Sequence, residues 1–398
     1  YWPVSYQFGD PTVISNRGLP LSGVRFSEIM RGVGEIRASL QLADDEVRAL
    51  YPWDKVIPRK TGIVVVRDVF DDSTGTWISE AVQHYIVLAA PRDPETGRME
   101  IMGLTIEAAW ARRLITKAIT WSGVDQTTIA ADLLDPTKWS KTALGPNPWP
   151  GWITVDPPTN PTGVTRDFSY ADGQESNLLE AHQNRSQLAT NSYEWTTKPR
   201  VLSGTDAASA NTFRIQYVLG FPKLGRLLTD TSPAPRLRYD RNGGGNVVSY
   251  KYQHDGSQCA NIVWGRGKGY EDLQAKTVVS VPEWLNGFLQ SETRFSDPDV
   301  ESVSTLADYC NRFLLERLGS EQFLAKLTLR GDRAPFFGTY VIGDEVTLDT
   351  NDSTWPDDML GPDGFLSLDS RIFGWTVTPP QGGTAETVEL VISGGDLA

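Results

Sequence analysis

Residues 35–42 have the sequence EIRASLQL, in which apolar and polar side chains alternate without interruption. The apolar members, Ile36, Ala38, Leu40 and Leu42, would all lie on one face of an extended strand. A helix would need these side chains three or four positions apart, so the period of two predicts a strand with one buried face. Such a strand is typical of an antiparallel sheet that packs one face against a core.

The same alternation recurs between turn-forming residues along much of the chain. Strands are predicted at 62–68, 82–89 and 99–106, with turn residues at 71–75 and 93–97 between them. Their spacing predicts a small antiparallel barrel or sandwich. Further strands are predicted downstream, at 167–170, 213–220, 246–252, 261–264, 277–281, 323–330, 340–349, 370–378 and 386–393.

The segment 303–318 has the clearest helical pattern in the sequence. Its apolar residues recur at the spacing of one helix face: Leu306, Tyr309, Cys310, Phe313, Leu314 and Leu318. Ser304 can cap its start and Gly319 can end it. We expect this face, including Phe313, to be buried in the core. Shorter helices are predicted at 108–115, 127–134 and 176–188, and the proline-rich stretch 145–163 is predicted to be a loop that no regular element crosses.

The size and charge of the chain limit its possible functions. With 398 residues it can form two to four domains. The formal net charge of −13 argues against a protein that grips nucleic acid, because neutralising phosphates requires clustered Lys and Arg. The same charge is compatible with a surface past which DNA slides, or with solubility alone. No apolar run of about 18 residues occurs, so no membrane-spanning helix is expected, and no secretory signal is visible.

The histidines and cysteines lack the spacing of catalytic or metal sites. His84, His182 and His254 share no short metal-ligand spacing, and neither an HExxH motif nor a GxSxG elbow occurs. His84 is expected to be a packed or surface residue of a strand. Cys259 and Cys310 are expected to be ordinary buried thiols, because two cysteines outside a CxxC motif cannot form a disulfide framework.

Residues 265–269, with the sequence GRGKG, invite comparison with a phosphate-binding loop. The GxxxxGK[ST] spacing is absent, and Tyr270 stands where a metal-binding hydroxyl would be needed. We expect a tight loop after a strand, whose Arg266 and Lys268 could meet DNA or an acidic neighbour.

Acidic residues gather in several predicted turns: Asp44-Asp45-Glu46, Asp71-Asp72, Asp297 with Asp299, and Asp357-Asp358. Glycoside hydrolysis needs two carboxylates at a defined separation, which adjacency in sequence does not fix. Asp349, Asn351 and Asp352 could bind a calcium ion. The Gly and Glu that an EF-hand loop requires are, however, absent from the corresponding positions of the sequence. We therefore assign no catalytic, cofactor-binding or metal-binding residue, and we expect no cofactor and no enzymatic activity.

An ordered series of short segments carries a resemblance to a known family. Its members are LQL (40–42), YPWD (51–54), TGIVVVRD (61–68), WARRLI (110–115), NIVWGRG (261–267), TLADY (305–309), IGDEVTL (342–348), SRIFGW (370–375) and ETVEL (386–390). In this order they resemble the minor tail proteins of bacteriophages with long, non-contractile tails, the tail-tip or baseplate hub family. The resemblance covers roughly residues 34–393.

The resemblance implies a structural protein of the virion, at the tail tip. Proteins of this kind form a homotrimer in which each subunit contributes two small barrels, so that three subunits join the sixfold tail tube to the threefold tip. The implied neighbours are the distal tail ring protein, the tape measure protein and downstream tip or receptor-binding proteins. DNA would pass through the ring without specific binding.

The expected fold class is β-rich α+β, with two small antiparallel β-barrel domains and helix-containing insertion domains. The expected domains are 1–120 as a first β-barrel tube domain, 121–200 as a helix- and loop-rich insertion, 201–300 as a β-rich middle domain and 301–398 as a helix with a C-terminal β-barrel domain.

A carbohydrate-binding or cell-wall-degrading tail protein is the alternative. Its candidate sugar-stacking residues are Trp139, Trp149 and Trp152, which burial against a neighbouring subunit would equally explain.

Overall fold

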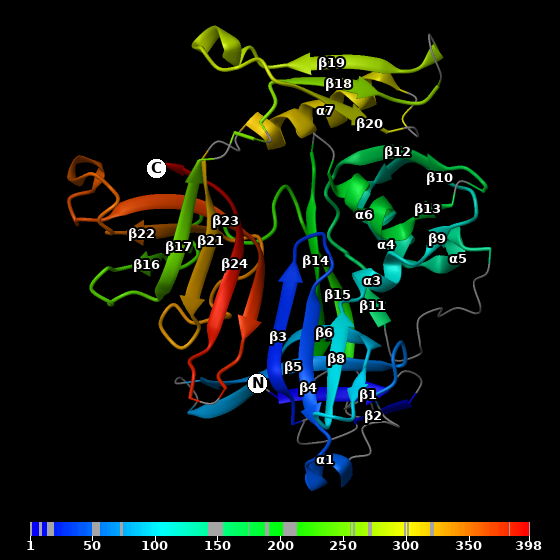
Figure 1. Cartoon of the computed structure of the whole chain (residues 1–398). Coiled ribbons are helices and arrows are strands. Elements are labelled where there is room, and N and C mark those ends of the chain that lie inside the picture. Colours follow the sequence, from blue (N-terminus) through cyan, green and yellow to red (C-terminus); the bar gives the residue numbers. More distant parts are fainter. Residues whose placement is uncertain are drawn as a thin grey trace. The chain divides into compact units, whose positions relative to one another are not determined.

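The chain folds into two compact units in the computed structural model (Figure 1). Unit 1 comprises Tyr1–Gln183, Trp195–Gly220 and Gly374–Val388, and unit 2 comprises Asn184–Glu194, Phe221–Phe373 and Glu389–Ala398. The residues that the structure describes are 2–7, 10–13, 20–49, 56–71, 75–141, 154–173, 175–187, 191–201, 213–254, 256–257, 259–269, 273–297, 300, 302–318, 322–381 and 383–397.

Unit 1 is built on an antiparallel sheet with the strand order β23-β3-β4-β8-β6-β5-β1-β2. The strands are β1 (Trp2–Gln7), β2 (Asp10–Val13), β3 (Ser22–Ile29), β4 (Glu35–Gln41), β5 (Thr61–Asp71), β6 (Thr76–Ala89), β8 (Arg98–Leu104) and the Gly374–Val377 part of β23 (Leu366–Thr378), and short β7 (Arg92–Asp93) pairs with β8. The alternation at 35–42 is confirmed, because Ile36, Ala38 and Leu40 of β4 are buried and Glu35 is exposed. This face of β4 therefore belongs to the core of unit 1.

Short helices and small sheets complete unit 1. The helices are α1 (Asp45–Ala49), α3 (Glu107–Trp110), α4 (Gln126–Leu134), α5 (Pro136–Trp139) and most of α6 (Leu178–Ser186). The sheets are β9 (Leu114–Ile115) with β13 (Ser176–Asn177), β10 (Ile119–Asp125) with β12 (Thr165–Tyr170), and β11 (Thr154–Asp156) with β15 (Phe213–Gly220) and β14 (Glu194–Val201). Asp125 caps α4 by accepting a hydrogen bond from the Thr127 amide at 2.8 Å.

Two sequence predictions for unit 1 are wrong. The helix predicted at 108–115 ends at Trp110, and Leu114 and Ile115 instead pair with Asn177 and Ser176 as strand β9. The proline-rich stretch 145–163 contains strand β11, which lies parallel to β15. In both places pairing with a distant segment outweighs the local pattern.

An aromatic cluster fills the interior beside α6. The rings of Trp110, His182, Trp195 and Tyr217 are all buried, with centroid separations between 5.0 and 6.1 Å. The four rings come from elements spread between Glu107 and Gly220, so this cluster joins α3, α6, β14 and β15 into one core.

Unit 2 contains a second sheet with the strand order β17-β21-β24-β23-β22-β16. Its strands are β16 (Leu237–Tyr239), β17 (Val247–His254), β21 (Gln322–Arg330), β22 (Glu345–Thr350), the first part of β23 and most of β24 (Thr387–Leu397), and a short 3-10 helix η4 (Asp357–Met359) follows β22. The strand predicted at 340–349 begins only at Glu345, because residues 341–344 form a tight turn. The β-rich prediction is confirmed, while neither sheet closes into a barrel within the described residues.

The remainder of unit 2 is a three-stranded sheet covered by one helix. The strand order is β19 (Lys276–Ser280), β18 (Ile262–Arg266) and β20 (Glu292–Ser296), and α7 (Val303–Leu318) packs on one face (Figure 1). A 3-10 helix, η3 (Glu283–Asn286), lies between β19 and β20. Among the described residues no helix combines the length and apolar character needed to cross a membrane.

The apolar face predicted for α7 is buried except at Phe313 and Leu318, which are half-buried. Leu306, Cys310 and Leu314 are fully buried, and a Cβ on Gly265 of β18 would lie 2.5 Å from the Cys310 sulfur. Helix and strand therefore approach so closely that only glycine fits at position 265. Phe313 lies at the margin and is only half-buried, with the Arg317 guanidinium 4.5 Å above its ring. The expectation that Phe313 belongs to the buried core is wrong: its ring contacts Phe295 of β20, with ring centroids 5.6 Å apart, but stays partly exposed.

Two adjacent leucines of α7 provide a direct test of this packing. Leu314→Ala should lower the free energy of unfolding by about 2–5 kcal/mol, because it removes a side chain that is 2% exposed and leaves a cavity. Leu315→Ala should cost less than about 0.5 kcal/mol, since Leu315 is 66% exposed. Urea denaturation of both variants measures the difference, and equal losses would mean that the helix presents another face to the sheet.

Candidate functional site

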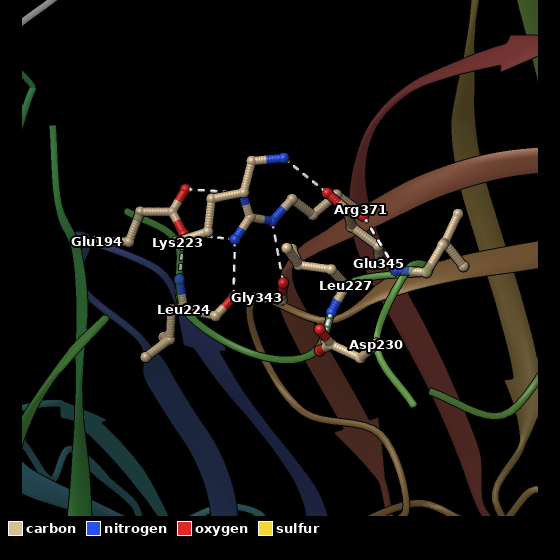
Figure 2. Close-up of polar contacts among 9 residues, drawn as sticks. Glu194, Lys223, Leu224, Leu227, Asp230, Gly343, Glu345 and Arg371 are labelled. Atoms are coloured by element: carbon tan, nitrogen blue, oxygen red, sulfur yellow. Dashed lines mark hydrogen bonds and ion pairs between the residues drawn. The ribbon is translucent and has the colours of Figure 1, made fainter. Parts of the chain in front are cut away.

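A buried arginine in β23 organises the most extensive polar cluster of unit 2 (Figure 2). Arg371 donates two hydrogen bonds to Glu194, from Nη1 to Oε1 at 3.0 Å and from Nη2 to Oε2 at 2.5 Å. Both side chains are only 10% exposed. The planar guanidinium and the carboxylate match in this two-bond arrangement, which fixes orientation as well as distance.

The remaining bonds of this pair tie two loops to the sheet. Arg371 donates from Nε to the Gly343 carbonyl at 3.0 Å and from Nη2 to the Leu224 carbonyl at 2.7 Å. The Leu224 amide donates in turn to Glu194 Oε2 at 2.8 Å. One ion pair thus holds the segment after β15 and the turn before β22 against the start of β14 (Figure 2).

A second layer of acidic residues binds the same loops. The fully buried Asp344 carboxylate accepts hydrogen bonds from the Arg226 amide at 2.8 Å, from Arg226 Nη2 at 2.5 Å and from the Val341 amide at 2.9 Å. Glu345 accepts from Lys223 Nζ at 2.7 Å and from the Leu228 amide at 3.2 Å. Partial burial raises the pKa of Glu345, but these bonds outweigh that effect and hold the pKa below its ordinary value.

Gly343 allows the close approach on which the cluster depends. Its φ is +94°, a conformation that other residues rarely adopt. A Cβ there would lie 2.4 Å from the Leu224 carbonyl oxygen, which is itself an acceptor of Arg371. Any larger residue would therefore separate the two loops.

This arrangement positions segments of the chain. Both Glu194 oxygens accept hydrogen bonds, and the Arg371 donors are directed at protein acceptors. Sequence reasoning missed the pair because its members are 177 residues apart. The only signal was the turn-forming Gly343-Asp344 before a strand, which many β-proteins share.

Unit 1 contains a buried acidic cluster of its own. Glu28 of β3 accepts a hydrogen bond from Thr196 Oγ1 at 2.6 Å, and Glu107 of α3 accepts one from Thr197 Oγ1 at 2.5 Å. Burial raises the pKa of Glu28 to about 7, although Lys198 and the Thr196 bond lower it. Burial likewise raises the pKa of Glu107. Two carboxyl groups in a low-dielectric interior are therefore sensitive to pH.

The histidines and cysteines have structural positions. Burial lowers the pKa of His84 and that of His182 to about 3, which keeps both rings neutral. His84 is a packed strand residue of β6, as predicted, and His254 ends β17. Cys310 is buried, which raises the pKa of its thiol to about 11, whereas Cys259 is only half-buried.

The GRGKG segment serves packing and a turn. Gly265 and Arg266 belong to β18 itself, so the strand extends further than predicted, while Tyr270 lies outside the described residues. A Cβ on Gly267 would lie 2.5 Å from the Val300 carbonyl oxygen. These glycines are explained by the closeness of the chain segments that pack on them.

The described members of the acidic groups have local partners. Asp44 bonds the Glu46 amide at 2.8 Å, Asp45 pairs with Arg48, and Asp358 is exposed. Asp349 binds Arg236 through two bonds, and Asp352 accepts from the Tyr250 hydroxyl. No group of three or more His, Cys, Asp or Glu side chains that could hold a metal occurs in the described part of the chain. The Asp72 and Asp299 positions and the side chains of Asp71 and Asp357 lie outside it.

Trp139, the described candidate for sugar stacking, is buried. Its indole N–H donates to the Leu133 carbonyl at 2.9 Å, and the Arg113 guanidinium lies 5.4 Å from its ring. Trp139 is therefore buried within the chain itself and does not serve the alternative of sugar stacking. Trp149 and Trp152 lie outside the described residues.

Comparison with solved structures identifies the fold. No family model matches the chain, and no curated protein sequence matches it. A tail protein from Neisseria meningitidis aligns over 99% of this chain and 97% of its own, with a TM-score of 0.56 and 10% identity. The 43 kDa tail protein of prophage MuSo2 from Shewanella oneidensis aligns over 98% of both chains, with a TM-score of 0.52 and 12% identity.

A third phage protein aligns to the same extent. Prophage tail protein gp18 from Listeria monocytogenes covers 98% of this chain and 94% of its own, with a TM-score of 0.50 and 13% identity. The chain has the fold of a phage tail protein. The family resemblance seen in the sequence is therefore confirmed at the level of the fold.

Breaking the Arg371–Glu194 pair should destabilise this tail-protein fold strongly. Arg371→Met leaves the buried Glu194 carboxylate without its counter-ion and takes a donor from two carbonyls, so we expect a loss of about 3–5 kcal/mol in the free energy of unfolding. The matched control is Arg330→Met, which breaks the exposed pair with Asp332 and should cost less than about 1 kcal/mol. Similar losses in chemical denaturation would show that the buried pair is not a structural determinant.

Glu28 should make unfolding pH-dependent in a defined direction. Its pKa is raised from 4.5 to about 7, so the folded state holds a proton that the unfolded state releases. Its stabilising contribution is fully present below pH 4.5 and is lost as the pH rises through about 7, which amounts to about 3 kcal/mol. His84 and His182 act in the opposite direction, because their lowered pKa values destabilise the fold as the pH falls.

The difference between wild type and Glu28→Gln isolates this contribution. The variant should gain stability relative to wild type as the pH rises from 4.5 to about 7. Thr196→Val removes a hydrogen bond that lowers the pKa of Glu28, so its inflection should move to higher pH. A pH-independent difference for Glu28→Gln would contradict the raised pKa.

Proposed function

We propose that this chain is a structural subunit of a bacteriophage tail, located in the virion, that works by assembly and not by catalysis. The observation that carries the proposal is the alignment with three phage tail proteins over 94–99% of each chain. Fold alone does not establish function, so the proposal also uses the properties of the chain itself. Its buried histidines are neutral, and several of its described acidic residues are engaged in turns, caps and ion pairs.

Within the tail, we propose the role of a hub that joins the sixfold tube to the threefold tip. Each subunit has two sheet-based units, so a trimer would supply six similar units to match the sixfold tube. A ring closes when each subunit contacts the next through the same interface and three such contacts complete a full turn. In unit 2 the terminal strands approach each other, since Tyr239 of β16 meets Tyr250 of β17 with ring centroids 5.2 Å apart. This contact supports a barrel-like form for the sheet, of which the proposed tube domain would consist.

The proposed neighbours are the distal tail ring protein, the tape measure protein and downstream tip or receptor-binding proteins. DNA would pass through the ring without specific binding, and the net charge of −13 supports passage because like charges repel. The segments 1–120, 121–200, 201–300 and 301–398 remain the proposed domains. Each compact unit gathers residues from more than one of them.

The test is a structure of assembled tails determined by electron cryo-microscopy. We expect this chain at the tail tip as three copies in a closed ring, with an acidic or neutral channel wall. The physical reason is that a channel lined with Lys and Arg would retain DNA through counterion release. Six copies per ring, a single copy, a strongly basic channel or absence from purified tails would each contradict the proposal.

A further inference from the structure

Strand β19 forms one edge of the three-stranded sheet in unit 2 (Figure 1). Within the described part of the chain it pairs with β18 alone, in an unbroken antiparallel register from Lys276 to Ser280. A strand at the edge of a sheet presents unpaired backbone N–H and C=O groups, which can pair with a strand of another chain. The outer edge of β19 is therefore a candidate contact surface.

The hydrogen bonds at the two ends of β19 show which of its backbone groups face outward. The Val281 amide donates to the Asn261 carbonyl at 3.0 Å, and the Gly267 amide donates to the Ala275 carbonyl at 2.8 Å. In an antiparallel pair, residue pairs that exchange hydrogen bonds alternate with residue pairs that do not. The odd-numbered residues of β19 thus bond to β18, and the backbone groups of its even-numbered residues point away from the sheet.

The outward-facing residues of β19 are Lys276, Val278 and Ser280, and they leave this edge open to pairing. Edge strands are commonly protected by proline, by a bulge or by charged side chains. Strand β19 contains no proline and no register shift, and its one charged residue, Lys276, lies at its end. The edge strand on the other side of the sheet, β20, has the exposed Arg294 at its centre. Pairing with another strand is therefore favoured at β19 over β20.

A pair of exposed apolar side chains leads to this edge on the face opposite α7. Gly265 of β18 faces Cys310 of α7, so the preceding residue, Trp264, points away from the helix. Trp264 lies directly opposite Val278 in the register, and the two residues are 42% and 49% exposed. A strand that continued the sheet beyond β19 would place a side chain beside Val278. It would thereby cover apolar surface that the described chain leaves exposed.

We propose that β19 pairs antiparallel with β19 of a second copy of this chain, about a two-fold axis at Val278. In this register all three outward-facing residues of each strand gain a partner: Val278 meets Val278 of the partner subunit, and each Lys276 meets a Ser280. The two lysines stay four residues apart along the strands, about 13 Å, so no like charges lie opposite each other. The apolar row of Trp264 and Val278 continues into the same row of the second copy.

This contact differs in symmetry from the hub contact proposed above. A two-fold contact uses the same surface on both copies, whereas a three-fold ring requires two different surfaces on each copy. The β19 contact would therefore join chains that do not belong to the same ring. It does not rest on the hub role, because it is measured on the isolated chain and the hub role is tested in assembled tails.

The first experiment is sedimentation equilibrium of the full chain over a range of concentrations. We expect the mass to rise with concentration from that of one chain toward twice that value, because a single strand contact is smaller than the interface of a permanent dimer. Val278→Pro removes an outward N–H and no bond to β18, so it should weaken association at least about tenfold.

The matched control is Arg294→Pro in the other edge strand. The bonds of Ser291 and Asp297 to β18 place the odd-numbered residues of β20 on the β18 side, so the Arg294 N–H also points outward. This variant should associate like the wild type. Circular dichroism of both proline variants checks that they are folded.

The second experiment tests the register and keeps every backbone N–H. Val278→Lys and Val278→Glu each place like charges opposite each other across the two-fold axis, so each variant alone should remain monomeric. An equimolar mixture of the two should associate again, because opposite charges then meet at position 278. Hydrogen exchange of the wild type should show protection of the Val278 amide only at high concentration, and protection of the Val279 amide at every concentration.

Several results would overturn the proposal. These are a wild-type chain that stays monomeric at every concentration, a folded Val278→Pro variant that associates like the wild type, and charged variants whose mixture does not associate. Association without any change in the exchange of the Val278 amide would identify a different interface. If Val278→Pro does not fold, the charged variants and the hydrogen exchange decide the question.

Discussion

The burial of one guanidinium constrains the architecture of unit 2. A charge in a low-dielectric interior must have both a counter-ion and hydrogen-bond acceptors, or the protein does not fold around it. Arg371 obtains these from Glu194, from the Leu224 carbonyl and from the Gly343 carbonyl. The three segments that contain these partners lie far apart in the chain, and their bonds to Arg371 hold them beside β23. Gly343 reaches its place by adopting a left-handed backbone conformation.

Other buried carboxyl groups of the protein also depend on nearby hydrogen-bond donors. Asp344 is fully buried and takes its donors from Arg226 and from the backbone of its own turn. Glu28 in unit 1 accepts a hydrogen bond from the Thr196 hydroxyl, and burial raises its pKa to about 7. At Glu345 the hydrogen bonds outweigh the effect of burial and lower the pKa, whereas at Glu28 burial outweighs them and raises it.

Local periodicity in the sequence predicted the strands and helices that bury one face and expose the other. The alternation of β4, the capped helix α4 and the apolar face of α7 all follow from it. It failed at Leu114–Ile115, at Thr154–Asp156 and at 340–344, because pairing or a turn set by distant residues decides the structure there. It also could not find Arg371 and Glu194, since two charged residues 177 positions apart carry no mutual signal in a single sequence.

The low identity to the three similar tail proteins, 10–13%, has a physical basis. A core tolerates many apolar substitutions when volume and pattern are kept, so chains can diverge widely while the fold persists. The surface is under fewer of these constraints, so similarity of fold does not show what the surface binds. In this chain the buried polar groups that carry the fold are largely satisfied by one another, as Arg371 and Asp344 show. The exposed leucines at 285 and 289 are different, because nothing within the described chain covers them. Exposed apolar side chains of this kind mark contacts that the folding of the described chain leaves unmade.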